Sequence, residues 1–232
     1  MRESRGKTGI IFDLDGVLLD SAQFHRRAWY ALAAELSAPM CDSFFWETFG
    51  QTNTSILRRL LGRELDAAEN TRLSERKEEL FRAEARGELA LFPGVANALD
   101  VLKREAFRLA LGTSTPRSNV EFYYRELGLG RYFDAYVCMD DIRRGKPDPE
   151  VFLLAAQRLG LPPARCIVVE DALMGIEAAK AAGMACVAVA TTNPAEVLRQ
   201  KSRADVVLSR TAELTPLLAR EILDGAPTRR RR

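Results

Sequence analysis

Short apolar runs separated by helical patterns constrain the fold of this chain more than any other feature of its sequence. Six such runs lie at residues 9–12, 107–111, 136–139, 166–169, 185–189 and 206–208. Their length and continuous apolar character are typical of strands buried on both faces of a parallel sheet. Between most of them, apolar residues recur at helical spacing, as at 95–104, 151–159 and 175–182. Strands alternating with helices predict an α/β fold with a doubly wound, Rossmann-like parallel sheet.

The alternation stops between residues 21 and 89. Segment 66–86 is a long, charged helical pattern, and no part of 21–89 has the character of a strand. Four apolar residues near its start fall on one helical face: Ala28, Trp29, Leu32 and Leu36. We therefore expect an all-helical insertion at 21–89 within a discontinuous α/β core made of residues 1–20 and 90–232. Residues 225–232, rich in arginine, are expected to form a flexible tail.

Charge and composition narrow the class of function. Lysine and arginine total 34 against 32 aspartate and glutamate, which gives a net charge of +2 and no reason to expect a nucleic-acid partner. The run Arg229–Arg232 is interpreted as a solvated tail, with a weak contact to a polyanion as the alternative. The sequence contains neither a signal peptide nor a membrane span, so we expect a cytoplasmic protein without a membrane partner.

Cysteine and histidine usage excludes several kinds of site. The four cysteines show no C-x-x-C spacing: Cys41, Cys138, Cys166 and Cys186. We interpret them as buried free thiols in a reducing compartment. His25 is the only histidine, which excludes a metal site with several histidines and disfavours a serine–histidine triad.

Two carboxylates follow the first apolar run, in the sequence Asp13-Leu14-Asp15-Gly16. Alternate residues of a strand point to opposite faces, so both carboxylates can approach one centre only if the backbone turns, which Gly16 permits. Ligands of open α/β sheets collect at the carboxyl ends of the strands. Asp13 and Asp15 are therefore candidate site residues, and the alternative is a polar strand end followed by a turn.

Further polar groups follow the later runs. Thr113 and Ser114 suit the binding of an anion, or an N-cap of the next helix. Lys146, held between Gly and Pro in Gly-Lys-Pro-Asp-Pro, can direct its ammonium at a phosphate, or is a solvated loop lysine. Glu170 and Asp171 supply carboxylates of the kind that Mg²⁺ takes as ligands, or Asp171 caps a helix.

Taken together and in this order, these motifs resemble those of the haloacid dehalogenase superfamily. The resemblance covers roughly residues 10–208 and rests on D-x-D-G-V at Asp13–Val17, on Thr113, on Lys146 in G-K-P-D-P, and on Glu170-Asp171. The insertion is similar to the cap domain of the subgroup that contains β-phosphoglucomutase and phosphoglycolate phosphatase. The resemblance implies a phosphoric monoester hydrolase that requires Mg²⁺ and acts on small-molecule phosphate esters, and we expect a monomer.

The resemblance also implies roles for the two aspartates and for the metal ligands. Asp13 would attack phosphorus and become an aspartyl-phosphate, while Asp15 would protonate the leaving group and then activate water. Mg²⁺ would be held by Asp13, the Asp15 main-chain carbonyl and Asp171, with Glu170 supporting the metal from behind. Aspartate at position 15 favours a phosphatase or phosphomutase over a dehalogenase, because a halide leaves without a proton.

The remaining core residues would bind the phosphoryl group. Thr113 and the Ser114 amide would hold its oxygens, and Lys146 would offset charge on it and on Asp13.

Three residues of the insertion are candidate substrate contacts. His25 and Lys77 resemble cap residues of β-phosphoglucomutase, although His25 could instead pack within the cap and Lys77 could be a solvated helix charge. Asn53 stands where the mutase carries an arginine that grips a second phosphate, and an amide lacks that cationic fork. We therefore predict a phosphatase of small phosphorylated metabolites, sugar phosphates above all. The alternatives are a β-phosphoglucomutase-like phosphomutase and a catalytically inactive binding or regulatory protein.

Overall fold

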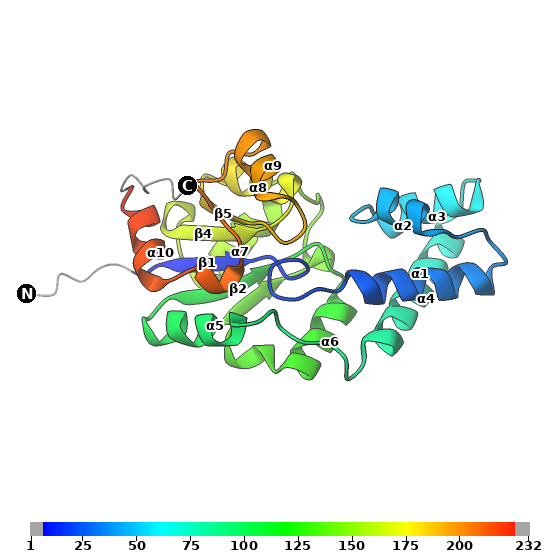
Figure 1. Cartoon of the computed structure of the whole chain (residues 1–232), viewed down its shortest axis with the longest axis horizontal. Coiled ribbons are helices and arrows are strands. Elements are labelled where there is room, and N and C mark those ends of the chain that lie inside the picture. Colours follow the sequence, from blue (N-terminus) through cyan, green and yellow to red (C-terminus); the bar gives the residue numbers. More distant parts are fainter. Residues whose placement is uncertain (1–6, 226–232) are drawn as a thin grey trace, which may run out of the picture. The chain divides into compact units, whose positions relative to one another are not determined.

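The computed structural model describes residues 7–225 of the chain (Figure 1). It divides into two compact units. The core unit runs to Asp20 and resumes at Ala90, and the helical unit comprises Ser21–Leu89. The predicted arginine tail at 229–232 lies outside the described residues.

A six-stranded parallel sheet forms the centre of the core unit, in the order β3-β2-β1-β4-β5-β6. Its strands are β1 (Gly9–Phe12), β2 (Arg108–Gly112), β3 (Ala135–Val137), β4 (Cys166–Glu170), β5 (Ala185–Val189) and β6 (Val206–Leu208). β1 pairs with both β2 and β4, so that Gly9 lies opposite Arg108 on one side and Cys166 on the other. Every residue of β1 and β4 is buried, as expected for central strands covered on both faces. The predicted α/β fold is confirmed.

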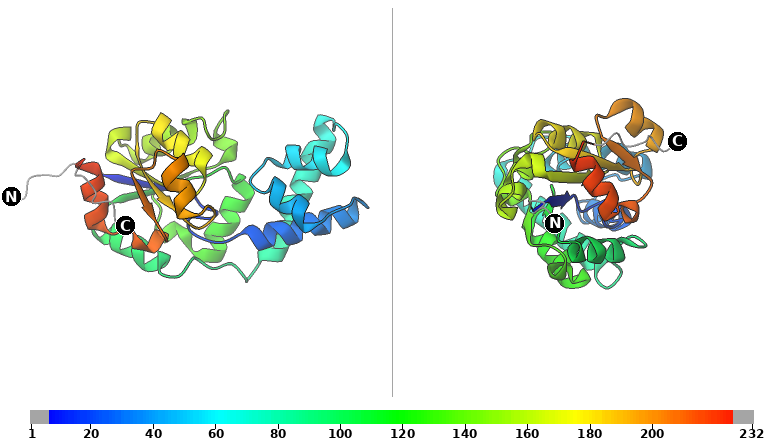
Figure 2. Two further views of the ribbon diagram at one scale, coloured as in Figure 1. Left: turned by 45° about the horizontal axis from the view of Figure 1, so that its top comes forward. Right: turned by 90° about the vertical axis from the view of Figure 1, so that its left-hand side faces the viewer.

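Helices pack on both faces of this sheet (Figure 2). They are α5 (Val95–Arg104), α6 (Arg117–Leu127), α7 (Glu150–Leu159), α8 (Leu173–Ala181), α9 (Ala195–Lys201) and α10 (Pro216–Leu223). α7 and α8 bury apolar residues such as Phe152 and Ile176 against Ile11 and Val168 of the sheet. This packing fixes the carboxyl ends of β1 and β4 side by side.

Strand β3 is shorter than the apolar run 136–139 predicts. The Asp141 carboxylate accepts a hydrogen bond from the Cys138 backbone N–H at 3.0 Å. This bond turns the chain into a 3₁₀ turn at Met139–Asp141, so the strand ends at Val137. A side chain that competes for a backbone donor has therefore overridden the apolar pattern.

The helical unit contains α1 (Ala22–Glu35), α2 (Asp42–Thr48), α3 (Asn53–Leu61) and α4 (Ala67–Ala85). Side-chain caps begin two of them: Thr52 accepts a hydrogen bond from the Ser55 N–H, and Asp66 accepts one from the Glu69 N–H. The unit has its own apolar core, which includes Trp29, Leu32, Phe45, Ile56, Leu57 and Leu73.

The cysteines differ in part from the prediction. Cys138, Cys166 and Cys186 are buried free thiols, but Cys41 is exposed. Cys41 stands at the N-terminal boundary of α2 rather than in an apolar run, and this position leaves it at the surface. Among residues 7–225, no helix combines the length and the apolar character needed to cross a membrane.

Candidate active site

The chain turns sharply after β1, at the first pair of candidate aspartates. The Asp13 N–H still donates to the Val169 carbonyl at 3.0 Å, so Asp13 extends the pairing of β1 with β4. Asp13 is buried, whereas Asp15 retains part of its exposure. Gly16 adopts a φ of 78°, and a Cβ there would lie 2.1 Å from Asp171 Oδ2. The turn thus requires glycine both for its conformation and for its close approach to Asp171.

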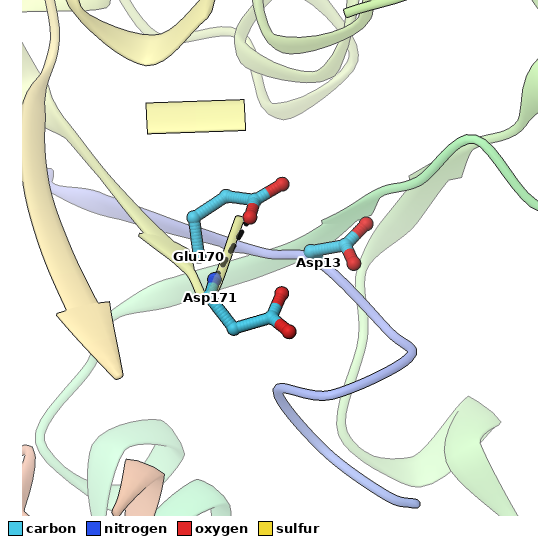
Figure 3. Close-up of side chains that lie close together, drawn as sticks. All are labelled: Asp13, Glu170 and Asp171. Atoms are coloured by element: carbon cyan, nitrogen blue, oxygen red, sulfur yellow. Dashed lines mark hydrogen bonds between the residues drawn. The ribbon is translucent and has the colours of Figure 1, made fainter. Parts of the chain in front are cut away.

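Three carboxylates gather where β1 and β4 end. Asp13, Glu170 and Asp171 each place an oxygen within 4.8 Å of the others, and all three residues are buried (Figure 3). The Lys146 ammonium lies 2.8 Å from Asp13 Oδ1 and 2.6 Å from Glu170 Oε1. Lys146 is therefore not the solvated loop lysine that the sequence left open.

Burial dominates the electrostatics of this cluster. It raises the pKa of Asp13 to about 7, with Lys146 opposing the rise and Glu170 adding to it. Burial and the neighbouring Glu170 likewise raise the pKa of Asp171 well above its ordinary value. Burial disfavours the charged form of Lys146, but Asp13 and Glu170 outweigh it and raise the pKa of Lys146. Three carboxyl groups therefore surround the one ammonium group of Lys146. An excess of carboxylates over cationic groups is typical of a site for a divalent cation.

Hydrogen bonds distinguish Glu170 from its two neighbours, and Figure 3 draws the one that it accepts from the Asp171 N–H. Glu170 Oε2 accepts the backbone N–H groups of Asp171 and Ala172, both at 2.8 Å, and Oε1 accepts Lys146. Both oxygens of Glu170 already accept hydrogen bonds, so Asp13 and Asp171 are the better direct ligands for a hard cation. Glu170 would then support the metal site without binding the cation directly. The donor set fits Mg²⁺, which takes one or two carboxylates and keeps room for phosphate oxygens and water.

Loop residues after β5 also hold the acidic cluster in place. Thr192 donates its hydroxyl to Asp171 Oδ2, and the Asn193 amide donates to the Asp171 carbonyl at 3.0 Å. Thr191 donates to the Gly16 carbonyl. Sequence reasoning missed these residues because they follow a strand without forming a recognisable motif.

Thr113 follows β2 and begins a chain of hydroxyl groups that leads to Asp15. The Thr113 hydroxyl donates to the Thr115 hydroxyl at 3.0 Å, and the Thr115 hydroxyl donates to Asp15 Oδ2 at 2.6 Å. The Tyr123 hydroxyl donates to the other Asp15 oxygen at 2.9 Å. Ser114 lies between the two threonines and is exposed.

The capping alternatives for these residues are excluded. The N-cap of α6 is Pro116, and that of α8 is Ala172; neither cap makes a side-chain hydrogen bond. Thr113, Ser114 and Asp171 are therefore available for other roles.

The three candidate residues of the helical unit form one polar cluster with Glu78. The Lys77 ammonium lies 2.7 Å from His25 Nδ1 and 2.9 Å from Glu78 Oε1, and the Asn53 amide donates to the same Glu78 oxygen at 2.8 Å. Lys77 is only 3% exposed, so it is not a solvated helix charge. His25 stacks on Phe81 with 4.1 Å between ring centroids. Burial and the charge of Lys77 lower the pKa of His25 well below 6.5.

Named phosphatases are among the proteins that this chain resembles, and together with the buried acidic site they identify it as a phosphoric monoester hydrolase. Residues 7–183 match the model of the haloacid dehalogenase-like hydrolases, and the chain belongs to this family.

Relatives in this family include phosphatases and a phosphomutase. The chain is 36% identical over 180 residues to a phosphorylated carbohydrates phosphatase of Thermotoga maritima, covering 75% of this chain and 81% of that protein. It is 33% identical over 221 residues to the chloroplastic 5-amino-6-(5-phospho-D-ribitylamino)uracil phosphatase of Arabidopsis thaliana, covering 94% of this chain but 58% of that protein. The crystal structure of β-phosphoglucomutase from Clostridium difficile superposes with a TM-score of 0.80 at 27% identity, covering 95% of this chain and 98% of the other.

Proposed function

We propose that the protein is a Mg²⁺-dependent phosphatase of small phosphorylated metabolites, sugar phosphates above all, and that it acts through an aspartyl-phosphate on Asp13. The observation that carries this proposal is the buried Asp13 carboxylate, 2.8 Å from the Lys146 ammonium and clustered with Glu170 and Asp171. The similarity to a phosphorylated carbohydrates phosphatase supports the substrate class. We expect the protein to act as a monomer.

Two displacements at phosphorus make up the proposed reaction. A carboxylate oxygen of Asp13 attacks phosphorus as the ester oxygen leaves, and Asp15 donates a proton to that oxygen. Asp15, now a carboxylate, takes a proton from water, which attacks the same phosphorus and releases inorganic phosphate and free Asp13. Each step moves one proton through Asp15, so the residue returns to its starting state after one turnover.

Charge compensation lets two anionic groups react. Mg²⁺, when bound, offsets the repulsion between the Asp13 carboxylate and the phosphoryl oxygens. The Asp13 and Asp171 side chains and the Asp15 main-chain carbonyl would hold it, with Glu170 as support. Lys146 bonds to Asp13 and Glu170 and adds a fixed positive charge beside the nucleophile. Thr113 and the Ser114 amide would bind phosphoryl oxygens.

The helical unit favours a phosphatase over a phosphomutase. The Asn53 amide is bonded to Glu78, and the same Glu78 oxygen pairs with Lys77. This cluster offers no guanidinium fork to hold a second phosphate. We keep His25, Lys77 and Asn53 as proposed substrate contacts. The phosphomutase alternative retains support from the structural similarity to β-phosphoglucomutase.

Asp13→Asn tests the proposal directly. The amide is a poor nucleophile and a weaker metal ligand, so turnover should fall by up to about 10⁶-fold while the circular dichroism spectrum is unchanged. Acid-quenched wild-type enzyme should retain radioactive phosphate from labelled substrate, and the variant should retain none. Asp224→Asn, at an exposed position, is the matched control and should keep full activity.

Metal removal provides the second arm of this test. Wild-type turnover should vanish in EDTA and return with Mg²⁺.

Two outcomes would contradict the proposal. Retention of more than about a tenth of the wild-type kcat in Asp13→Asn would remove Asp13 from the nucleophile role. Absence of any turnover of p-nitrophenyl phosphate by wild-type protein with Mg²⁺ would instead favour an inactive binding or regulatory protein.

A further inference from the structure

Two hydroxyl groups of the core unit hold the carboxylate of Asp15 from both sides. Thr115 donates to Oδ2 at 2.6 Å, and Tyr123 donates to Oδ1 at 2.9 Å. Each oxygen of the carboxylate therefore has a defined partner, which restricts rotation of the group about its terminal bond.

Tyr123 is placed to do this by the middle of α6. Its side chain is fully buried and packs beside Phe122, with 6.1 Å between the ring centroids. An unpaired buried hydroxyl is costly, and Asp15 supplies a polar partner for that of Tyr123. Tyr123 lies outside every motif of the sequence that points to phosphate chemistry.

We propose that Tyr123 is a positioning residue, whose hydroxyl orients the Asp15 carboxyl group for proton transfer to the leaving oxygen. This inference rests on the proposed role of Asp15 as general acid. A proton donor increases the rate only if it lies within hydrogen-bonding distance of the leaving oxygen, on which negative charge develops. A carboxyl group that can rotate freely spends less time in that geometry, so the loss of the Tyr123 hydroxyl slows the step that needs the proton.

The dependence on the leaving group separates this role from a purely structural one. Sugar phosphates release a strongly basic alkoxide, which needs a proton as the bond breaks. p-Nitrophenyl phosphate releases a weakly basic phenolate, which needs little help. The ratio kcat/KM reports the steps up to release of the alcohol, so attack by water on the aspartyl-phosphate does not enter this comparison.

Tyr123→Phe keeps the buried ring and removes only the hydroxyl. We expect kcat/KM for a hexose phosphate to fall about tenfold, as for the loss of one hydrogen bond. The value for p-nitrophenyl phosphate should change less than about twofold. Thr115→Val should show the same selective loss, and Thr115→Ser should not, because serine keeps the hydroxyl.

Tyr124→Phe is the matched control. Tyr124 is the next residue of α6, and its buried hydroxyl has no hydrogen-bond partner within the described part of the chain. Its substitution should leave both kcat/KM values unchanged. Equal losses for the two substrates in Tyr123→Phe, or no loss for either, would overturn the positioning role.

Asp15→Asn distinguishes failure of this inference from failure of the proposed function. It should reduce kcat/KM for the hexose phosphate by a hundredfold or more, and that for p-nitrophenyl phosphate far less. If Asp15→Asn shows this selectivity and Tyr123→Phe does not, the positioning role of Tyr123 is wrong and the general-acid role of Asp15 is retained. If Asp15→Asn shows no selectivity, Asp15 is not the general acid and both assignments fall.

Discussion

At the scale of single residues, two glycines allow the carboxylates of the site to lie where they do. A Cβ at Gly16 would come within 2.1 Å of Asp171 Oδ2, and a Cβ at Gly175 within 1.8 Å of Glu170 Oε1. Both distances are far below van der Waals contact, so any side chain there must displace a carboxylate. Gly175 is the better position for a test, because its helical backbone in α8 would tolerate any residue. Only the lack of space beside Glu170 requires glycine there.

Gly175→Ala is expected to lower both activity and metal binding. The added methyl group must push Glu170 away from Lys146 and from the backbone N–H groups that it accepts. Overpacking of this kind costs about 1–3 kcal/mol, and the displaced carboxylate disturbs the nucleophile through Lys146. We expect at least a tenfold fall in kcat and weaker Mg²⁺ binding in a calorimetric titration.

Gly130→Ala provides the comparison for this substitution. A Cβ there would meet only Tyr124, at 3.9 Å, an ordinary contact. It should leave kcat and metal affinity at wild-type values. Unchanged turnover in Gly175→Ala would show that Glu170 can relocate without consequence for the site.

Site residues at strand ends or within a motif, such as Asp13, Asp171 and Lys146, were open to prediction from the sequence, and residues outside both were not. Asp13 and Asp171 each follow an apolar run, and the topology of a parallel sheet brings such positions to one edge. Tyr123 lies inside a helix and donates a hydrogen bond to Asp15. Thr192 lies in a loop and donates one to Asp171. Their positions depend on packing between elements distant in sequence, which no local pattern encodes. The catalytic roles of all these residues remain predictions.

At the scale of elements, α1 and α4 bring the only histidine of the chain into a partly buried setting. His25 of α1 stacks on Phe81 of α4 and contacts the Lys77 ammonium through Nδ1. The apolar pattern predicted a helical region here, but it did not place these partners, because helical periodicity fixes which face is buried and not the neighbour it meets.

The stability of the helical unit should depend on pH through His25. Its pKa is well below 6.5 in the native state, so the unfolded chain takes up the proton first as the pH falls. The free energy of unfolding should therefore decrease below about pH 6.5, by at most about 1.4 kcal/mol per pH unit, and be flat above it. His25 keeps some exposed surface, which reduces the effect.

Tryptophan fluorescence isolates this measurement, because both tryptophans of the chain, Trp29 and Trp46, belong to the helical unit. Urea unfolding of wild type and of His25→Gln should be compared at pH 7.5 and pH 5.5. The wild type should lose more stability between the two values than the variant. Equal losses in the two proteins would assign the pH dependence to other groups.

At the scale of the whole molecule, the products of the reaction separate a phosphatase from a phosphomutase. A mutase must hold a bisphosphate and turn it, and Asn53 lacks the charge-assisted phosphate contact that arginine would make. Such a contact contributes roughly 1.5–3 kcal/mol, or about tenfold to more than a hundredfold in binding. We expect inorganic phosphate to form from β-glucose 1-phosphate, with little glucose 6-phosphate.

This prediction is checked by ³¹P NMR with Mg²⁺ and a trace of the bisphosphate. Asp13→Asn serves as the background sample, because it should form neither product. Glucose 6-phosphate appearing much faster than inorganic phosphate would replace the phosphatase assignment with the mutase.

The discontinuity of the core has a consequence for how the chain is made. β1 pairs with β2 and β4, whose first paired residues are Arg108 and Cys166, so Gly9 leaves the ribosome long before either partner exists. At about 5–20 residues per second, the wait for β4 lasts roughly ten to thirty seconds. The helical unit is complete well before then and closes on itself, with Arg27 near its start paired to Glu84 and Glu88 near its end.

A folded insertion shortens the flexible chain between β1 and β2. Most of that connection is then already ordered, and joining the two strands costs about 1 kcal/mol less chain entropy than closing the same length of open coil. The helical segment that interrupts the sheet in sequence therefore lowers the entropic cost of joining β1 to β2 once β2 has been synthesised.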